Sequence, residues 1–421
     1  MILIKSGKIA DAEKTYTADI LIENGKIKQI GENLSAKGAE EIDAEGLTII
    51  PGMIDMHCHL REPGQEYKED ILSGSKAAVK GGFTSIVCMP NTDPVIDNAG
   101  LIAYVQERAK KVGLCKIYPT GAITTGLGGT QLTEMGELKA AGAVAFTDDG
   151  KPVSSGKMMR NALNYAKCLD ALLILHEEDL DLRADGVMNE GYYSSMLGLR
   201  GINRAAEESM IARDIALAES LKCRIHIAHV STRGGFDMIK KAKARGVSVT
   251  CETMPHYFSA DDSWVVGYDS NTKVNPPLRT KDDVAAAIEA IKDGTVDAIA
   301  TDHAPHHVDE KDVEYDIALF GISGFESALS LMVTHLLPAG VSLNKIAELT
   351  SKNPAKILRI PGGSIAEGEP ADLTIFDENE KYVFTKADMV SRGKNSPFIG
   401  RELVGKAKYT VVDGVIKYKE S

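Results

Sequence analysis

The chain has 421 residues, of which 43% are hydrophobic and 26% charged, a composition typical of a large globular protein. Its 48 Lys and Arg against 60 Asp and Glu give a net charge of −12, which argues against nucleic acid as a partner, because polyphosphate affinity depends on basic side chains. The six cysteines are scattered and no apolar stretch is long enough to cross a bilayer, so the sequence predicts reduced thiols in a cytoplasmic protein that does not act at a membrane.

The first 50 residues predict a group of short strands. The stretches "MILIKSGKI", "ADILIENGKIKQIG" and "AEGLTIIPG" are apolar and β-branched, and they contain Asn-Gly or Glu-Gly turns. This part of the chain is therefore expected to be β-structure.

Residues 51–361 alternate short apolar runs with longer segments that are apolar at helical spacing, such as "EDILSGSKAAVKGG" and "AAEESMIARDIALAESLKC". The eight runs are "GMIDMHCH" (52–59), "FTSIVCMP" (83–90), "CKIYPTGAIT" (115–124), "AVAFTDDG" (143–150), "LLILHEE" (172–178), "RIHIAHVS" (224–231), "VSVTCETMPH" (247–256) and "VDAIATDHAP" (296–305). Strands that alternate with helices predict parallel βαβ units, and eight of them favour a closed (β/α)8 barrel over an open sheet.

Residues 362–421 return to the style of the beginning, with the strand-like stretches "GEPADLTIFD" and "KYTVVDGVIKY". Two strand-rich ends that flank a barrel are expected to meet. The sequence therefore predicts an α/β protein in which 51–361 form a TIM barrel, while 1–50 and 362–421 together form a small β-sandwich domain.

Polar side chains gather where the predicted barrel strands end. Seven of the eight runs end in polar or ionisable residues, among them His57, His59, Asp148, Asp149, His176, His229, His256, Asp302 and His303. Because the C-terminal ends of barrel strands converge on one mouth, these groups are expected together. Two residues apart on a strand, His57 and His59 point the same way and can share a metal, whereas Cys58 between them should face the barrel wall. Imidazole and carboxylate suit a divalent ion such as Zn²⁺, and the number of strand ends leaves ligands for two ions.

A lone His-X-His motif is weak evidence for a metal, since histidines are often satisfied within a core. Histidines on the first, fifth and sixth strands, with an aspartate on the eighth, are much harder to explain by packing. By contrast, the strand parity of His226 and the helical apolar setting of His335 favour structural roles. The sequence leaves His256 and His307 open.

The same mouth carries groups suited to an anion. Arg61 follows the first strand and offers a planar fork that matches a carboxylate, where elsewhere a surface ion pair would be the default. Asn91 follows the second strand, Asn275 lies in "KVNPPLR" and His306 follows the eighth strand. Singly, each can be a turn former. Together they predict a polar frame for a small substrate.

At this point the motifs match a family. "DMHCHLREPG", "MPNT", "FTDDGKPV", "ILHEE", "HIAHVST", "KVNPPLR", "TDHAPHH" and "FGISGFE" together resemble the dihydroorotases of the amidohydrolase superfamily, of the kind found as separate bacterial chains. The resemblance covers essentially the whole chain, and "TDHAPH" is shared with hydantoinases and allantoinases. It implies a (β/α)8 barrel with a small β-sandwich domain.

The resemblance implies a zinc-dependent cyclic amide hydrolase. The reaction is the reversible cyclisation of N-carbamoyl-L-aspartate to L-dihydroorotate plus water in pyrimidine biosynthesis, by a zinc-activated hydroxide with Asp302 as general acid and base. The implied zinc ligands, two ions per subunit, are His57, His59, Asp149, His176, His229 and Asp302. In most relatives a carboxylated lysine bridges the two ions. The resemblance implies that this subgroup uses Asp149 instead, and Lys151 is the nearby lysine that offers an alternative bridge.

The resemblance also implies the substrate contacts. Arg61, Asn91 and His306 would hold the unreactive carboxylate, with His59 at the junction of metal and substrate. Asn275 and the backbone of Phe320 and Gly321 would hydrogen-bond the ureide edge.

Two other readings stay open beside this one: another cyclic-amide hydrolase, whose substrate lacks the carboxylate, and a catalytically inactive partner of aspartate transcarbamoylase. Arg61 argues against the first, and the complete ligand set argues against the second. A homodimer is the expected assembly, and association with aspartate transcarbamoylase stays open beside catalysis.

Overall fold

The structure is a computed structural model that describes residues 1–420. A closed ring of parallel strands forms its centre. The regular strands of the ring are β6 (Met53–Cys58), β7 (Phe83–Cys88), β8 (Lys116–Pro119), β9 (Leu173–Leu175), β12 (Ile225–Ile227), β13 (Val249–Thr253) and β14 (Ala298–Ile299). They form two arcs, β6-β7-β8 and β9-β12-β13-β14. Phe146 joins the arcs through bridges to Gly121 and Leu173, and Cys58 closes the ring through a bridge to His303. The predicted barrel is confirmed, with its fourth position occupied by a short extended segment.

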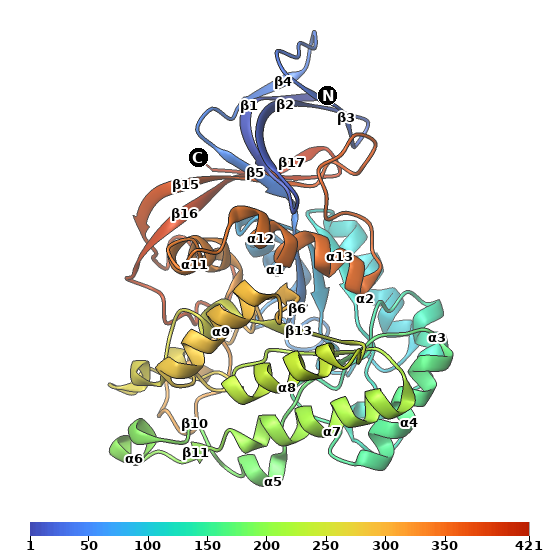
Figure 1. Cartoon of the computed structure of the whole chain (residues 1–421), viewed down its shortest axis with the longest axis vertical. Coiled ribbons are helices and arrows are strands. Elements are labelled where there is room, and N and C mark those ends of the chain that lie inside the picture. The colour runs from blue at the N-terminus through green and yellow to red at the C-terminus, as the bar shows by residue number, and fades with distance from the viewer. Residues whose placement is uncertain (421) are drawn as a thin grey trace.

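Helices connect the barrel strands and cover the outside of the ring (Figure 1). The main ones are α1 (Ile71–Lys80), α2 (Ala99–Val112), α3 (Met135–Ala140), α4 (Gly156–Cys168), α7 (Ala205–Leu221), α8 (Arg233–Ala244), α9 (Lys281–Asp293) and α11 (Phe325–Leu336). Their starts are fixed by side chains: Asp70 accepts the backbone N–H of Ser73 at α1, and Thr280 accepts that of Asp283 at α9. Buried apolar residues of these helices belong to one cluster with residues of the strands.

Shorter elements lie in the loops and after the barrel. They are α5 (Leu180–Arg183), α6 (Tyr192–Leu197), α10 (Val308–Lys311), α12 (Leu343–Ala347), α13 (Asn353–Leu358), the ribbon β10 (Met188–Asn189) and β11 (Gly201–Ile202), and the single turns η1 (Thr125–Leu127), η2 (Pro255–Tyr257), η3 (Asp262–Val265), η4 (Ser270–Thr272) and η5 (Glu348–Lys352). Several of these follow β9, β13 and β14 and build up the mouth of the barrel. In residues 1–420, no helix is both long and apolar enough to cross a membrane.

The two ends of the chain form one sheet at the far end of the molecule, where both termini lie (Figure 1). Its strands are β1 (Ile2–Ala10), β2 (Thr15–Glu23), β3 (Lys26–Gly31), β4 (Glu40–Asp43), β5 (Thr48–Pro51), β15 (Leu373–Val383), β16 (Glu402–Val412) and β17 (Val415–Lys419). The strand order is β17-β16-β15-β5-β1-β2-β3, with β4 beside β1. Antiparallel pairing of β5 with β15 joins the two segments, and Ile4, Ile49, Leu373 and Val411 pack in their common core.

Apolar packing continues inside the ring, where Ile54, Val87, Ile174 and Ala298 belong to one buried cluster. A barrel of this size is filled by side chains, so it is a core and not a channel. A cavity for a ligand lies at the mouth, where the polar strand ends lie.

Candidate active site

A cavity of about 210 Å³ lies at the C-terminal ends of the barrel strands. It is lined by His59, Arg61, Asn91, Asp149, Gly150, His176, Glu178, Arg183, His229, Asn275, Asp302, Ala304, His306, Phe320 and Gly321. The structure thus brings together all the site residues predicted from the sequence except His57, which is fully buried beside the cavity. The sequence reasoning missed Glu178 and Arg183, although the run "ILHEE" places a carboxylate two residues after His176.

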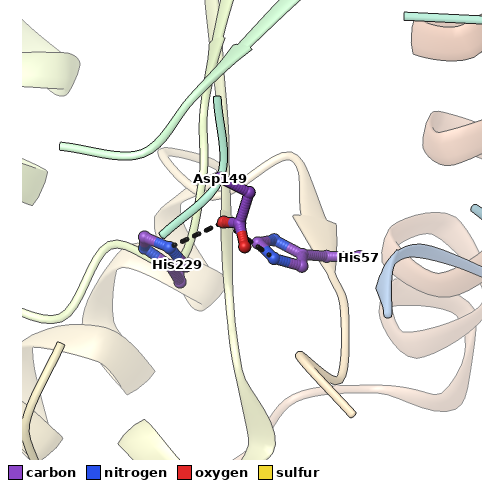
Figure 2. A group of neighbouring side chains, drawn as sticks. All are labelled: His57, Asp149 and His229. Atoms are coloured by element: carbon purple, nitrogen blue, oxygen red, sulfur yellow. Dashed lines mark ion pairs between the residues drawn. The ribbon is translucent and has the colours of Figure 1, made fainter. Parts of the chain in front are cut away.

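The carboxylate of Asp149 lies among four histidines. Its Oδ1 is 3.2 Å from Nε2 of His57, 3.4 Å from Nδ1 of His176 and 3.7 Å from Nε2 of His229. Its Oδ2 is 3.5 Å from Nε2 of His59. Figure 2 shows Asp149 between His57 and His229, which reach it from different strands of the ring. One carboxylate therefore faces two pairs of histidines, a first pair of His57 and His59 and a second pair of His176 and His229.

Asp302 completes a second group with the first histidine pair. Its Oδ1 lies 3.0 Å from Nε2 of His59 and 3.6 Å from Nε2 of His57. Two sets of three potential ligands result, His57 with Asp149 and His229, and His57 with His59 and Asp302. The ligand atoms within each set are less than 4.8 Å apart, which is close enough to share one ion.

The electrostatics of these groups favour a cation. Nε2 of His57 is buried and makes no well-aligned hydrogen bond within residues 1–420, although Oδ1 of Asp149 lies 3.2 Å away. Nε2 of His229 lies 2.8 Å from Nδ1 of His176, so two basic nitrogens face each other. Burial by itself lowers the pKa of His57, but the Asp149 carboxylate and its neighbours outweigh it and raise that pKa well above the usual value. In the same way Asp149 and Glu178 outweigh burial and raise the pKa of His176 to about 10. The donor set therefore fits divalent metal ions.

Two carboxylates lie behind the histidines and fix their ring nitrogens. Glu252 is fully buried, and its two oxygens lie 2.9 Å from Nδ1 of His57 and 3.3 Å from Nε2 of His226. Glu178 lies 3.7 Å from Nε2 of His176, which leaves Nδ1 of that ring toward Asp149. A carboxylate behind a ligand imidazole sets its tautomer and increases its basicity. Buried beneath the site, His226 serves as the second partner of Glu252.

Asn91 orients the ring of His59, as Glu252 orients the ring of His57. Its Oδ1 lies 2.9 Å from Nδ1 of His59, and its Nδ2 donates to Oδ2 of Asp149 at 3.2 Å. The His59 ring therefore donates through Nδ1 and directs Nε2 at Asp302. The family resemblance predicts that Asn91 binds the substrate carboxylate; in this structure its amide contacts the predicted ligands His59 and Asp149.

The neighbours of Asp149 take other roles. Asp148 accepts backbone N–H groups of Ile123 and Thr124 at 2.7 and 3.0 Å, so it braces the preceding loop. Burial raises the pKa of Asp148 to about 6, against these hydrogen bonds. The Lys151 side chain is exposed, and its backbone N–H closes a turn onto the Asp148 carbonyl.

The opposite wall of the cavity carries positive charge. Arg61 is buried, and its Nε donates to the Pro305 carbonyl at 3.2 Å. Nε2 of His306 donates to the Phe320 carbonyl at 2.7 Å. Burial and the nearby charge of Arg61 hold the pKa of His306 well below its usual value, so this imidazole is neutral. Among residues 1–420 no carboxylate pairs with this buried guanidinium, which is therefore suited to an anionic ligand.

Three residues of the site have backbone angles in the left-handed region, which side chains with a Cβ rarely adopt. Their φ values are 59° at Arg61, 34° at His229 and 46° at Asp302. Such conformations cost about 1–3 kcal/mol each and persist where the surroundings impose them, which is common at functional sites. The backbone thus directs these side chains toward the cavity at a cost in stability.

The remaining histidines lie outside the cavity. Nδ1 of His303 accepts the N–H of Gly324 at 3.1 Å, and His307 caps the start of α10. His335 is a partly buried residue of α11. His256 is buried, and burial lowers its pKa to about 4.

Comparison with known proteins identifies relatives over the full length. Residues 46–235 match the family described as "Dihydro-orotase-like", and residues 202–418 match the "Amidohydrolase family". The chain is 51% identical over 421 residues to a dihydroorotase of Geobacter metallireducens, covering 99% of each. It is 52% identical over 416 residues to a dihydroorotase of Ruminiclostridium cellulolyticum, covering 98% of this chain and 97% of the relative.

Solved structures share the fold at lower identity. An L-hydantoinase (dihydropyrimidinase) from Arthrobacter aurescens superposes with a TM-score of 0.89 at 24% identity, covering 99% of this chain and 95% of that one. A D-hydantoinase from Bacillus sp. AR9 gives 0.88 at 27% identity, covering 100% and 95%. The barrel and its sheet are therefore an architecture known from solved structures.

Proposed function

The chain belongs to the dihydroorotase family of amidohydrolases, and from this premise we propose how its cavity performs the reaction. The reaction is the reversible cyclisation of N-carbamoyl-L-aspartate to L-dihydroorotate plus water, in de novo pyrimidine biosynthesis. The observation that carries the proposal is the meeting of two histidine pairs at the Asp149 carboxylate, in one cavity with Arg61.

Two zinc ions are the proposed cofactors. His57, His59 and Asp302 would hold one, His176 and His229 would hold the other, and Asp149 would bridge them. Bound there, the ions would supply Lewis acidity, which lowers the pKa of a water and polarises a carbonyl. The support is the chemistry of the donor set, in which buried imidazole nitrogens and carboxylate oxygens converge.

Arg61 is the proposed anchor of the substrate carboxylate that does not react. Its guanidinium can form two parallel hydrogen bonds to a carboxylate, and burial strengthens them because water is excluded. The second N–H of the Asn91 amide would complete this end of the site, together with His306 if its Nε2–H turns from the Phe320 carbonyl to the substrate. Asn275 and the backbone of Phe320 and Gly321 would bind the ureide edge, which offers both N–H donors and carbonyl acceptors.

Asp302 is the proposed general acid and base. Burial by itself raises its pKa, but the hydrogen bond with His59 and the charge of His57 outweigh it and lower the pKa, so the carboxylate is ionised near neutral pH. In hydrolysis Asp302 accepts the proton of the attacking water and returns it to the leaving ring nitrogen. In synthesis the order reverses, and Asp302 begins protonated.

Hydantoinase-type turnover is the competing function, since the hydantoinases share the fold. Arg61 argues against it, because the substrates of those enzymes lack the carboxylate of dihydroorotate. The test measures turnover of dihydroorotate and of dihydrouracil by the purified protein, with metal content determined on the same sample. Strong preference for dihydroorotate with about two zinc ions per chain is expected; comparable turnover of both compounds would assign the chain to the other class.

A homodimer is the proposed assembly, with aspartate transcarbamoylase as a proposed further partner. Tyr192, Val308 and Ile317 are 74%, 62% and 61% exposed in the segments that follow β9 and β14, so apolar side chains are available to a partner there. The six cysteines are free thiols, which suits a reducing compartment such as the cytoplasm. Light scattering, alone and with the transcarbamoylase, tests both assemblies.

A further inference from the structure

The connection between β15 and β16, residues 384–401, reaches away from the terminal sheet to the mouth of the barrel. From its contacts we infer that Asn395 is a positioning residue of the substrate pocket. Its side-chain amide holds together the loop that carries His306 and the loop that carries Gly321. The inference rests on the proposed function, which places substrate against these two residues.

The amide of Asn395 is buried and uses all of its hydrogen-bonding capacity. Its Oδ1 accepts the backbone N–H of His306 and the hydroxyl of Ser323, each at 2.9 Å. Its Nδ2 donates to the carbonyls of Ala304 at 3.1 Å and Gly321 at 2.9 Å. Two donors and two acceptors are the full inventory of an asparagine side chain. Removal of this side chain therefore leaves polar groups of both loops unpaired in a buried place.

Close approach of the backbones gives independent evidence for the same junction. A Cβ on Gly393 would lie 2.6 Å from the backbone nitrogen of His306 and 2.6 Å from Cβ of Pro305. A Cβ on Gly321, whose φ is +150°, would lie 2.6 Å from the Ala304 carbonyl oxygen and 2.9 Å from Cδ2 of His306. The two substrate loops and the 391–396 segment are thus packed without room for a methyl group.

The junction also controls Arg61. The loop held by Asn395 contains Pro305, whose carbonyl accepts the hydrogen bond from Nε of Arg61. A shift of this loop therefore moves the guanidinium together with His306 and changes the place where the carboxylate binds. Asn395 does not line the cavity, so its effect on substrate passes through these neighbours. Because the predicted metal ligands do not contact it, metal content is expected to stay constant.

The test compares Asn395→Ala and Gly393→Ala with Lys394→Ala as matched control. Lys394 is exposed, and within residues 1–420 its side chain donates to the carbonyls of Lys386 and Met389 in its own segment. KM and kcat for dihydroorotate, zinc per chain and thermal unfolding are measured for each. Both test variants are expected to raise KM by at least about tenfold, with a smaller change in kcat, since small misplacements of binding groups have effects of this order. Zinc content and the control should match the wild type.

Unchanged KM in both variants, even with lowered thermal stability, would show that the junction is structural only. A Cβ on Gly393 would also lie 2.9 Å from Oδ1 of Asn395, so Gly393→Ala displaces the same junction without removing the amide, and it decides the question where Asn395→Ala does not fold. Arg61→Lys is assayed in parallel. If Arg61→Lys raises KM and the two junction variants do not, the positioning role is wrong while the proposed function stands. If none of the three raises KM, the assignment of the substrate pocket itself fails.

Discussion

Exchange of Glu252 for glutamine tests whether the carboxylate behind His57 tunes the metal centre. The substitution keeps the shape of the side chain and removes its charge. Glutamine can still accept from Nδ1 of His57, while its amide nitrogen faces His226, whose ring can change tautomer because Nδ1 lies 2.8 Å from the Thr250 hydroxyl. The geometry of His57 is therefore expected to survive, and the change isolates the charge.

The size of the effect follows from the pKa of Glu252. Burial by itself raises this pKa, but the bonds and charges of His226 and His57 outweigh it and lower the value from 4.5 to about 2. The two histidines together therefore favour the charged carboxylate strongly enough to overcome the effect of its burial. Because Glu252 divides its interaction between His57 and His226, the expected loss is roughly tenfold in metal affinity, the lower end of the range for lost outer carboxylates.

The assay is the zinc dissociation constant, measured by competition with a chromophoric chelator at fixed pH and salt. Glu326→Gln is the matched control, because Glu326 is also buried but, within residues 1–420, accepts from the backbone of Val390 and Ser391 and from no histidine. Roughly tenfold weaker zinc binding is expected for Glu252→Gln, and unchanged zinc binding is expected for the control. A folded Glu252→Gln protein that binds zinc within twofold of the wild type would refute the reasoning.

Four further perturbations test the remaining assignments. Asp302→Asn should keep the fold and lose at least about a hundredfold in turnover, the usual scale for a general acid-base group, so near-normal rates would remove Asp302 from the mechanism. Arg61→Lys should strongly reduce kcat/KM for dihydroorotate, since an ammonium cannot reproduce the planar fork; an unchanged ratio would contradict carboxylate binding there. Asp149→Ala should lose bound zinc and activity, whereas Lys151→Ala should keep its zinc, and activity should survive removal of bicarbonate; a bicarbonate requirement would identify Lys151 as the bridge. Burial and nearby Lys273 lower the pKa of Lys311 from 10.5 to about 7, so between these values the unfolded chain binds a proton that the folded chain does not. The unfolding free energy of the wild type, measured relative to Lys311→Met in urea, should therefore rise from pH 7 to pH 10 by up to about 1.4 kcal/mol per unit, and a flat difference would contradict it.

Local pattern was sufficient to predict the barrel. Apolar runs of strand length, separated by segments with helical periodicity, predict βα units from local sequence alone. Eight such units favour closure of the sheet into a barrel. The fourth unit is the instructive case. Its run "AVAFTDDG" forms only the isolated bridges at Phe146, because loop geometry around Asp148 and Thr124 replaces regular pairing there. The run was visible in the sequence, but its irregular backbone was not.

The sequence by itself determined the chemistry of the candidate site, because His57, His59, Asp149 and Asp302 each stand at a strand end and parallel strands bring their ends to one mouth. Only the tertiary structure decided which buried polar side chains orient these ligands and the substrate loops.

Glu252 meets His57 across 195 residues of chain, and Asn395 meets His306 across 89. No spacing or motif in the sequence predicts either pair. Each contact depends on how separate elements pack, and on which buried polar atoms then require a hydrogen-bond partner.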